Sequence, residues 1–251
     1  MDLHLSGKKV LVTGGSSGIG KSIAEEFLLE GAQVYIASRN KDEVDNTVSE
    51  LAKKGKIFGS EYDASDVLQI TEMVQKTISV LGGLDVLVNN AGVATQAPID
   101  QMTEEVWNKT IDVNLKGYVF VSKEVVGFMK QNKIKGSVVN ISSIAGAIGF
   151  AGLSAYCSSK HAIVGLTKTM ALDLAADNIR VNGIGPGVIE TAMTKSFLEN
   201  EQWKQFFLMK IPLKRVGQPV EIAKMALFLA SDAASYMTGT TVFIDGGWLT
   251  G

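Results

Sequence analysis

The chain has 251 residues, of which 46% are apolar and 20% are charged, a composition typical of globular proteins. Its net charge of −2 and the lack of a basic stripe argue against nucleic-acid binding. One cysteine (Cys157) and two histidines (His4 and His161) exclude a disulfide framework and leave too few ligands for a usual zinc site, so no metal is expected.

The longest stretch without a charged residue, residues 136–159, contains four glycines and six serines, which makes it a poor membrane span. The first residues contain no apolar run typical of a secretory signal. We therefore expect a cytoplasmic protein with no membrane partner.

Short apolar runs alternate with helical patterns from the start of the chain. Strands are predicted near residues 10–12, 34–37, 57–58 and 84–88. Helices are predicted near residues 19–31, 40–55 and 66–81. In the first helix, Ile19, Ile23 and Phe27 recur every four residues; in the second, Asn40 and Glu43 have the spacing of a capping box.

The same alternation continues through the second half. Strands are predicted at residues 137–141, 179–184 and 241–244, and helices at residues 103–129, 154–176 and 220–229. Apolar strands separated by helices are typical of a parallel sheet covered on both faces. The prediction is an α/β fold with a doubly wound, seven-stranded parallel sheet, formed by residues 1–251 as a single domain.

A glycine-rich segment, TGGSSGIG at residues 13–20, separates the first predicted strand from the first helix. Glycines allow a tight turn, and the N-terminus of a helix offers unpaired N–H groups to a phosphate. The alternative is a plain strand-to-helix turn, because the spacing of Gly14, Gly18 and Gly20 differs from the usual GxGxxG fingerprint.

This segment resembles the TGxxxGxG loop of the short-chain dehydrogenase/reductase family. Residues 89–92 (NNAG), residues 156–160 (YCSSK) and residues 186–187 (PG) are similar to three further motifs of that family, in the same order. The resemblance covers essentially the whole chain. It implies a Rossmann fold, a nicotinamide dinucleotide and the interconversion of a ketone and a secondary alcohol.

Within the family the chain is especially similar to 3-oxoacyl-(acyl carrier protein) reductases, in residues 187–194 and 211–217. It departs from them near the end of the catalytic helix. Those reductases tend to have basic residues there to dock the acidic carrier, whereas this chain has Asp173 and Asp177. The carrier as a partner is therefore in doubt.

The resemblance also implies the cofactor-binding residues. They are Gly14, Ser16, Ser17, Gly18, Ile19, Gly20, Ser38, Arg39, Asp63, Ala64, Asn90, Ala91, Gly92, Tyr156, Lys160, Pro186, Gly187, Val188 and Thr191. Asp63 and Ala64 would contact the adenine, and Val188 and Thr191 would hold the carboxamide. Asn90 would flank the adenine ribose, or brace the strand ends, or do both.

The second strand ends with Ser38 and Arg39, and these residues bear on the choice of cofactor. Ser38 stands where NAD-preferring relatives carry Asp, and a guanidinium suits the 2′-phosphate of NADP. Ser17 stands where NADP-preferring relatives often carry a second basic residue, and Arg39 could instead be a solvated surface residue. We predict that NADP(H) is preferred over NAD(H).

Four residues form the catalytic group that the resemblance implies: Asn114, Ser143, Tyr156 and Lys160. Tyr156 and Lys160 lie four residues apart and would share one face of a helix. A nearby ammonium would lower the pKa of the tyrosine, so that Tyr156 could act as general acid or base.

Ser143, thirteen residues before Tyr156, would hold the substrate oxygen; its neighbour Ser142 is the alternative. Asn114 would bind a water that connects Lys160 to solvent. Cys157 and His161 would point away from the Tyr156–Lys160 face, as packing or exposed residues.

Residues 191–212 correspond to the mobile lid of the family and contain Phe197, Trp203, Phe206 and Phe207. This enrichment predicts a lid over an apolar or uncharged substrate; the alternative is ordinary packing of two short helices. The predicted substrate-contacting residues are Ser143, Ile144, Ala145, Phe150 and Tyr156. Further pocket positions are predicted at Ile148, Val93 and Thr95, and none of these side chains is charged.

The leading hypothesis is an NADP(H)-dependent reductase of 3-oxoacyl or similar uncharged carbonyl compounds. Sugar or polyol dehydrogenases of the glucose or gluconate type share these motifs, and a cofactor-binding protein without catalysis is a remote third possibility. The resemblance further implies a homotetramer that assembles through the helices at residues 103–129 and 154–176 and through the C-terminal strand.

Overall fold

The computed structural model describes residues 3–251, which form a seven-stranded sheet with parallel neighbours throughout. The strand order is β3-β2-β1-β4-β5-β6-β7. The strands are β1 (Lys9–Thr13), β2 (Gln33–Ser38), β3 (Ile57–Glu61), β4 (Val86–Asn89), β5 (Ser137–Ile141), β6 (Arg180–Pro186) and β7 (Thr241–Ile244). The predicted doubly wound parallel sheet is confirmed.

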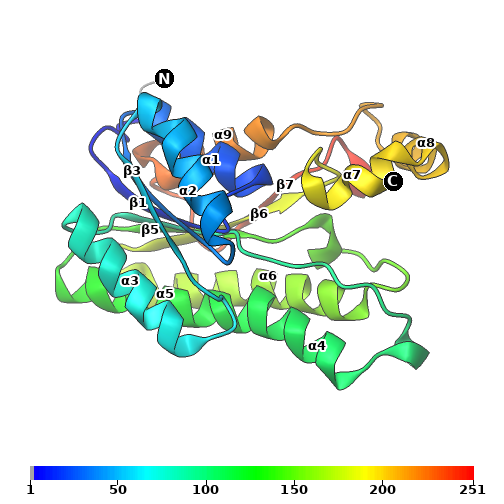
Figure 1. The fold of residues 1–251 in the computed structure, drawn as a ribbon, viewed down its shortest axis with the longest axis horizontal. Coiled ribbons are helices and arrows are strands. Elements are labelled where there is room, and N and C mark those ends of the chain that lie inside the picture. Colours follow the sequence, from blue (N-terminus) through cyan, green and yellow to red (C-terminus); the bar gives the residue numbers. More distant parts are fainter. Residues whose placement is uncertain (1–2) are drawn as a thin grey trace.

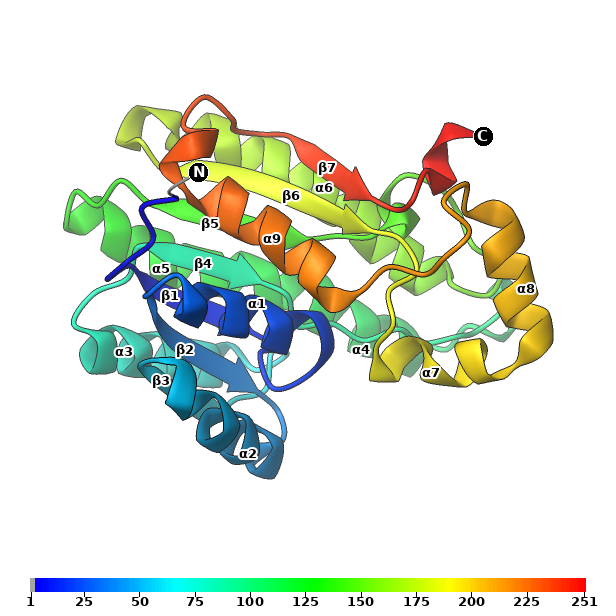
Figure 2. The same cartoon turned by 90° about the horizontal axis from the view of Figure 1, so that it is seen from above.

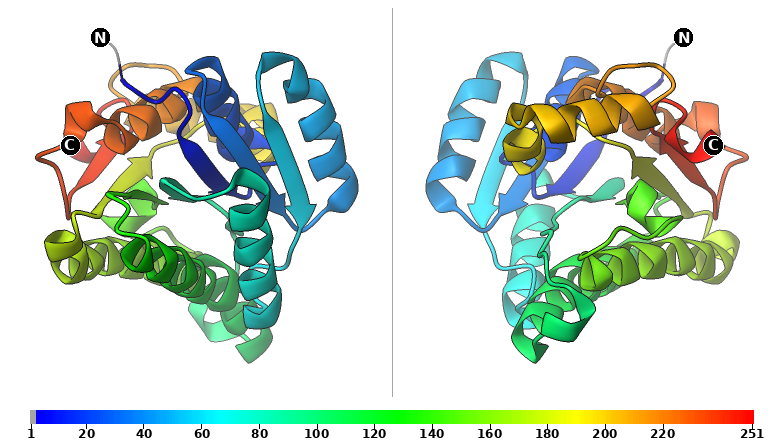
Figure 3. Two further views of the ribbon diagram at one scale, coloured as in Figure 1. Left: turned by 90° about the vertical axis from the view of Figure 1, so that its left-hand side faces the viewer. Right: turned by 90° about the vertical axis from the view of Figure 1, so that its right-hand side faces the viewer.

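Helices cover both faces of the sheet and give the molecule three layers (Figures 1 and 3). One face carries α1 (Gly18–Leu29), α2 (Lys41–Leu51) and α9 (Pro219–Ala230), and the other carries α3 (Val67–Leu81), α5 (Gly117–Gln131) and α6 (Ser154–Leu174). The remaining α-helices are α4 (Glu104–Ile111), α7 (Ala192–Glu199) and α8 (Glu201–Lys210). None of the helices within residues 3–251 is long and apolar enough to cross a membrane.

The strands are buried on both sides because their alternate side chains enter two different cores. Val10 and Val12 of β1 pack with α1 and α9, whereas Leu11 between them packs with α3 and α5. The register continues the row of Leu11 through Leu87 and Val138 in the neighbouring strands. Each central strand therefore needs a nearly continuous run of apolar residues, as the sequence predicts.

Polar residues begin the helices at the predicted places. The Asn40 side chain accepts hydrogen bonds from the N–H groups of Asp42 and Glu43 and so caps α2. Asp66 caps α3 in the same way, and Thr103 caps α4. These caps explain why the predicted starting points of the helices agree with the structure.

The predicted long helix at residues 103–129 is interrupted. Between α4 and α5 the chain forms a single π-type turn, η3 (Asp112–Lys116), which contains the buried Asn114. A π-type turn inside an α-helix often accompanies a functional site. The sequence did not predict this turn, because its apolar spacing is close to that of an ordinary helix.

The strand order reverses between β1 and β4, so the loops that follow these two strands diverge at the carboxyl edge of the sheet. Ligands of open α/β sheets bind in the crevice at such a point. Helices α7 and α8 lie beyond the same edge, next to the C-terminus (Figure 2). The fold therefore brings the glycine-rich loop, the end of β5 and the segment after β6 to one place.

Candidate active site

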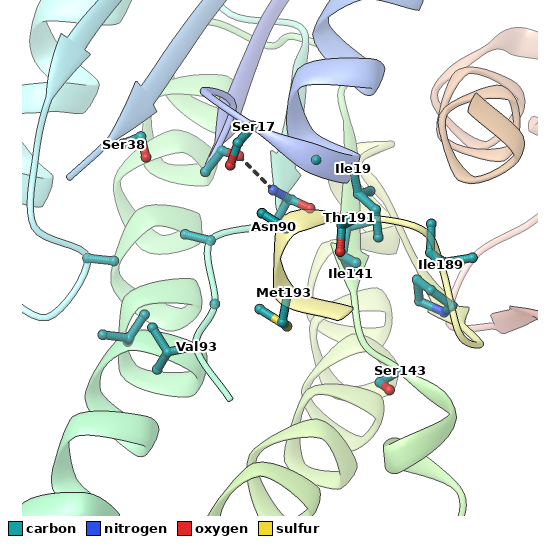
Figure 4. A pocket seen from close by; sticks show the side chains of 18 of the residues that line it. Ser17, Ile19, Ser38, Asn90, Val93, Ile141, Ser143, Ile189, Thr191 and Met193 are labelled. Carbon is teal, nitrogen blue, oxygen red and sulfur yellow. Dashed lines mark hydrogen bonds between the residues drawn. The ribbon is translucent and has the colours of Figure 1, made fainter. Parts of the chain in front are cut away.

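A pocket of about 340 Å³ opens at this edge of the sheet. Figure 4 shows Ser38 toward one end and Ser143 toward the other, with Asn90 and Thr191 between them. Most of the predicted cofactor residues line it: Gly14, Ser17, Gly18, Ile19, Ser38, Arg39, Asp63, Ala64, Asn90, Ala91, Gly92, Tyr156, Lys160, Pro186, Gly187 and Thr191. Its charged lining residues are Arg39, Asp63 and Lys160.

The glycine-rich loop and the first turn of α1 form one wall. Gly14 has a φ of +64°, and a Cβ there would lie 2.8 Å from the Cα of Ala91. A Cβ on Gly20 would lie 2.1 Å from the carbonyl oxygen of Gly14, so the loop closes only with glycine at both positions. Ser17, the N-cap residue of α1, makes no side-chain capping bond, which leaves the helix N–H groups available to an anion.

Asn90 joins this loop to β4. Its side-chain amide donates to the carbonyl oxygens of Thr13 and Gly14, each at 3.0 Å, and its N–H donates to the hydroxyl of Thr13. Asn90 thus braces the strand ends, one of the two roles predicted for it, while it also lines the pocket.

At the end of β2 a second, more open cavity adjoins the pocket, lined by Ser38, Arg39, Asn40, Lys41, Glu43 and Glu61. Arg39 forms no hydrogen bond or salt bridge within residues 3–251, and it lines both cavities. The hydrogen bonds from Ser65 hold the pKa of Asp63 below its usual value, and the charge of Arg39 acts in the same direction. This guanidinium is therefore available to an anionic ligand.

Two carboxylates stand beside Arg39 in the second cavity. The Ser16 hydroxyl donates to the Ser38 hydroxyl at 3.0 Å and to Glu43 at 3.3 Å. Ser16 therefore fixes the wall behind Ser38, although it does not line the main pocket. Glu43 and Glu61 put negative charge close to the place where a 2′-phosphate would lie, which opposes the attraction of Arg39.

Tyr156 and Lys160 share one face of α6, as their spacing predicts. The ammonium nitrogen of Lys160 lies 5.6 Å from the centre of the Tyr156 ring and donates to the carbonyl oxygen of Ile141 at 2.9 Å. The Lys160 side chain is only 4% exposed. Cys157 is buried nearby, and the exposed His161 contacts the carbonyl oxygen of Cys157 with Nδ1.

The expected lowering of the Tyr156 pKa is wrong for the cofactor-free protein. Burial raises the pKa of Tyr156 above its usual value, and the Ser143 side chain only partly offsets this. Burial also lowers the pKa of Lys160 to about 7. For Tyr156, desolvation therefore outweighs the attraction that an ammonium exerts on a phenolate.

The structure distinguishes the two serines after β5. The Ser142 hydroxyl is buried and donates to the backbone carbonyl of Lys160 at 2.9 Å. Both serines line the pocket, but Ser143 interacts with Tyr156 through its side chain, and its hydroxyl also accepts from the N–H of Ala145. Ser143 is therefore the serine in position to touch a substrate oxygen.

Asn114 lies behind the pocket wall, in the π-type turn. Its side chain accepts from the N–H of Val93 at 2.8 Å and donates to the Val93 carbonyl at 2.9 Å and to the Ser159 hydroxyl. The amide thus ties the strand-like segment after β4 to the helices. Both N–H groups of the amide are engaged and Oδ1 accepts one hydrogen bond, so a connecting water could bind this side chain only at the second lone pair of Oδ1.

Some predicted residues do not line the pocket. These are Ser16, Gly20, Thr95, Asn114, Ile144, Ala145, Ile148, Phe150 and Val188, whereas the predicted Val93 does line it. Ile144 and Ala145 are buried, and Phe150 packs on Trp248. Lining residues that the sequence did not predict are Tyr62, Val113, Ile141, Ile189, Ala192, Met193 and Thr194. Most of these flank predicted positions, and this proximity is the signal that could have found them.

The segment at residues 191–212 forms α7 and α8, and neither helix contains a buried residue. Its aromatic side chains contact one another and Trp248 of the C-terminal turn. Ring centres lie 5.9 Å apart for Phe197 and Trp203 and 6.2 Å apart for Phe207 and Trp248. The predicted aromatic enrichment is therefore one cluster, anchored to the body of the protein by Trp248.

Comparison with known proteins agrees with this geometry. A sequence-family model described as enoyl-(acyl carrier protein) reductase matches residues 14–249. A 3-oxoacyl-(acyl-carrier-protein) reductase FabG of Thermotoga maritima is 44% identical over 246 residues, which cover 98% of this chain and 99% of the relative.

Solved structures show the same fold over nearly the whole chain. A short-chain type dehydrogenase/reductase from Mycobacterium marinum superposes with a TM-score of 0.94 and 36% identity, covering 98% of this chain and 97% of the other. A protein from Agrobacterium tumefaciens, provisionally named a 2-deoxy-D-gluconate 3-dehydrogenase and holding NADP, superposes with a TM-score of 0.93 and 35% identity, covering 100% and 99%.

Proposed function

The chain belongs to the short-chain dehydrogenase/reductase family and is an oxidoreductase, and on this premise we propose that it interconverts a ketone and a secondary alcohol with NADP(H). One observation carries the proposal. Ser143, Tyr156 and Lys160 meet in the pocket that the glycine-rich loop and the uncapped N-terminus of α1 also line. A phosphate-binding element and a proton-transfer group thus share one site.

The residues present fit a nicotinamide dinucleotide. The N–H groups of α1 suit the pyrophosphate, Arg39 and Asp63 stand at the adenosine end, and Thr191 lies beside Gly18 in the middle of the pocket. When bound, the nicotinamide would supply or accept the hydride. The chain's own residues orient the substrate and move the proton.

In the reduction that we propose, the Ser143 hydroxyl holds the substrate oxygen and the Tyr156 hydroxyl gives it a proton. In the reverse direction Tyr156 accepts that proton. Lys160 assists this transfer because its positive charge favours the phenolate. Asn114 acts from behind the wall by fixing the segment around Val93, which is packed beside the pocket. All four residues are present, which argues against a cofactor-binding protein without catalysis.

NADP(H) is proposed as the preferred cofactor because Arg39 has no salt bridge within residues 3–251 and the end of β2 carries no carboxylate at Ser38. We expect Arg39→Asp to weaken binding of NADPH by at least tenfold and to leave NADH binding within about threefold. Titration calorimetry with both cofactors measures this. An Arg39→Asp variant that kept its preference for NADPH would contradict the assignment.

For the substrate we propose a 3-oxoacyl or similar uncharged carbonyl compound. The identity with the Thermotoga maritima reductase and the apolar, aromatic lid at residues 191–212 support this choice. A carrier protein as partner receives less support, because Asp177 forms a salt bridge of 2.8 Å with Lys130 and so neutralises a cation at this corner of the molecule.

A sugar or polyol is the second candidate, because the NADP-holding neighbour from Agrobacterium tumefaciens is named for a gluconate derivative. Initial rates of NADPH oxidation with a short β-ketoester, with NADH in parallel, test the first candidate. We expect turnover with NADPH. A panel of sugars and polyols with NADP⁺ tests the second, and a protein that binds cofactor but turns over none of these compounds would contradict the proposed function.

We also propose that the chain assembles as a homotetramer through α5, α6 and β7. Exposed apolar side chains on these helices, such as Val119 and Leu172, and the partly exposed edge strand β7 support this arrangement. Light scattering coupled to size-exclusion chromatography measures it, and a monomeric mass would contradict it. The cytoplasmic location stays a prediction.

A further inference from the structure

Tyr118 lies directly behind the proposed catalytic lysine. It belongs to the first turn of α5, its side chain is buried, and it does not line the pocket. The ammonium nitrogen of Lys160 lies 5.7 Å from the centre of the Tyr118 ring, close to its 5.6 Å separation from the Tyr156 ring. Two aromatic rings therefore stand within cation–π distance of one buried ammonium.

Tyr118 and Lys160 also share a hydrogen-bond acceptor. The Ile141 carbonyl oxygen at the end of β5 accepts from Lys160 at 2.9 Å and from the Tyr118 hydroxyl at 3.1 Å. A carbonyl oxygen has two lone pairs, and these two donors use both. The hydroxyl thus fixes the Tyr118 ring to the same atom that holds the lysine.

The Lys160 ammonium has no acidic partner among residues 3–251. The groups around it are the phenols of Tyr118 on α5 and Tyr156 on α6, the serines after β5, and the neutral amide of Asn114 on η3. Arg39 and Asp63 are the other charged residues that line the pocket.

We propose that Tyr118 is a positioning residue for the catalytic lysine: its ring stabilises the Lys160 ammonium, and its hydroxyl, bound to the Ile141 carbonyl, orients that ring. This inference rests on the proposed function, in which the charge of Lys160 assists proton transfer at Tyr156. Burial disfavours the ammonium, and the face of an aromatic ring counteracts that penalty. Tyr118 therefore maintains the charge without entering the pocket.

Two variants separate the ring from the hydroxyl. Tyr118→Leu removes both, whereas Tyr118→Phe keeps the ring and leaves the Ile141 carbonyl bound to Lys160. The first readout uses the cofactor-free protein: NMR titration of lysine labelled with ¹³C at Cε, with Lys160→Gln to assign the signal. We expect a lysine that titrates near pH 7 in the parent, about half a unit to one unit lower in Tyr118→Leu, and within about 0.3 units of the parent in Tyr118→Phe.

The second readout is the pH dependence of kcat for alcohol oxidation. A smaller positive charge on Lys160 raises the pKa of Tyr156. In Tyr118→Leu, the pH at which kcat rises should therefore increase by about as many pH units as the lysine pKa falls. Tyr118→Phe should keep the parent profile. Melting temperatures of both variants measure any loss of packing separately.

An unchanged lysine titration in a folded Tyr118→Leu protein would overturn the inference, whatever happens to its melting temperature. Equal shifts in Tyr118→Phe and Tyr118→Leu would also overturn it, because the ring would then carry no effect. If the parent turned over none of the tested substrates, the proposed function would fail, while the titration would still decide the contact between Tyr118 and Lys160.

Discussion

Helix α6, which packs on a face of the sheet, and the pair α7–α8, which lies beyond its carboxyl edge, are built in opposite ways. α6 contains eight buried residues, among them Lys160, whereas α7 and α8 contain none. The proposed proton-transfer group is thus held by a packed core, whereas α7 and α8 are held by ring contacts and by the hydrogen bonds of Thr194. The contrast teaches that the side chains proposed for proton transfer are fixed by packing, whereas the proposed lid has few buried contacts to fix it.

The free energy needed to displace each of these two regions differs accordingly. A fully buried large apolar side chain contributes about 1.5–3 kcal/mol, and α6 buries Ile163 and Leu174 together with smaller side chains, so displacing α6 would cost the sum of these contributions. An aromatic pair contributes about 0.5–1.5 kcal/mol beyond its buried area, and the lid depends on a handful of such pairs with Trp248 as their anchor. Opening of the lid should therefore cost far less free energy than displacement of Tyr156.

The largest expected effect is a loss of catalytic rate in a variant of α6. Tyr156→Phe removes the proton donor and keeps the ring, so kcat should fall about 10²–10⁴-fold. The dissociation constant of NADPH should stay within about twofold, as calorimetry would measure. Tyr236→Phe is the matched control, because Tyr236 is fully exposed. A Tyr156→Phe enzyme with normal turnover would remove Tyr156 from the mechanism.

The second prediction concerns the free energy of unfolding and how the buried Lys160 of α6 lowers it. Burial lowers the pKa of Lys160 from 10.5 to about 7. At pH 7 and below, this shift lowers the free energy of unfolding by on the order of 4 kcal/mol relative to a neutral side chain at this position. The loss declines as pH rises toward 10.5, because the folded protein is then neutral at Lys160 and the proton bound by the unfolded chain is progressively released.

Lys160→Met should therefore raise the free energy of unfolding at pH 7, by up to about 4 kcal/mol, while it abolishes catalysis. The gain should shrink toward zero near pH 10. The Ile141 carbonyl keeps its bond from Tyr118 in this variant. Urea denaturation at pH 6.5, 8 and 9.5 measures the trend, and a gain that grew with pH would contradict the assignment of the buried charge.

The smallest effect is expected at the lid. Trp203→Ala removes contacts with Phe197, Phe206 and Phe207, but the side chain is 47% exposed and outside the core. We expect KM for an apolar ketone to rise about three- to tenfold, with kcat and melting temperature nearly unchanged. Trp107→Ala, an exposed tryptophan on α4, is the control. A large loss of stability in Trp203→Ala would show that the lid is part of the core after all.

Local patterns predicted most of the fold. The bounds of β5 and β7 agree with the prediction to the residue, and Asn40 begins α2 where its capping chemistry requires. The spacing of Tyr156 and Lys160 correctly placed them on one helix face. Each of these features depends on residues close together in the sequence, within a few turns of helix or one strand.

Other features depended on distant contacts. The π-type turn at Asn114 is tied to Val93, and the raised pKa of Tyr156 follows from burial by surrounding elements. Glu61 stands beside Arg39 because β2 and β3 pair, with Ser38 opposite Glu61. The predicted substrate positions Ile144 and Ala145 turned inward instead of toward the pocket for the same kind of reason.

The sequence by itself therefore determined the order of the strands and helices, the glycine-rich loop and the identities of the proposed catalytic side chains. Only the tertiary structure decided which of them are desolvated, and which groups they meet. Tyr118 reaches Lys160 through the Ile141 carbonyl, an atom that belongs to a different element from either residue. Sequence periodicity predicts on which face of its own helix a side chain lies. The solvation and charge state of that side chain depend on what the rest of the chain packs against that face.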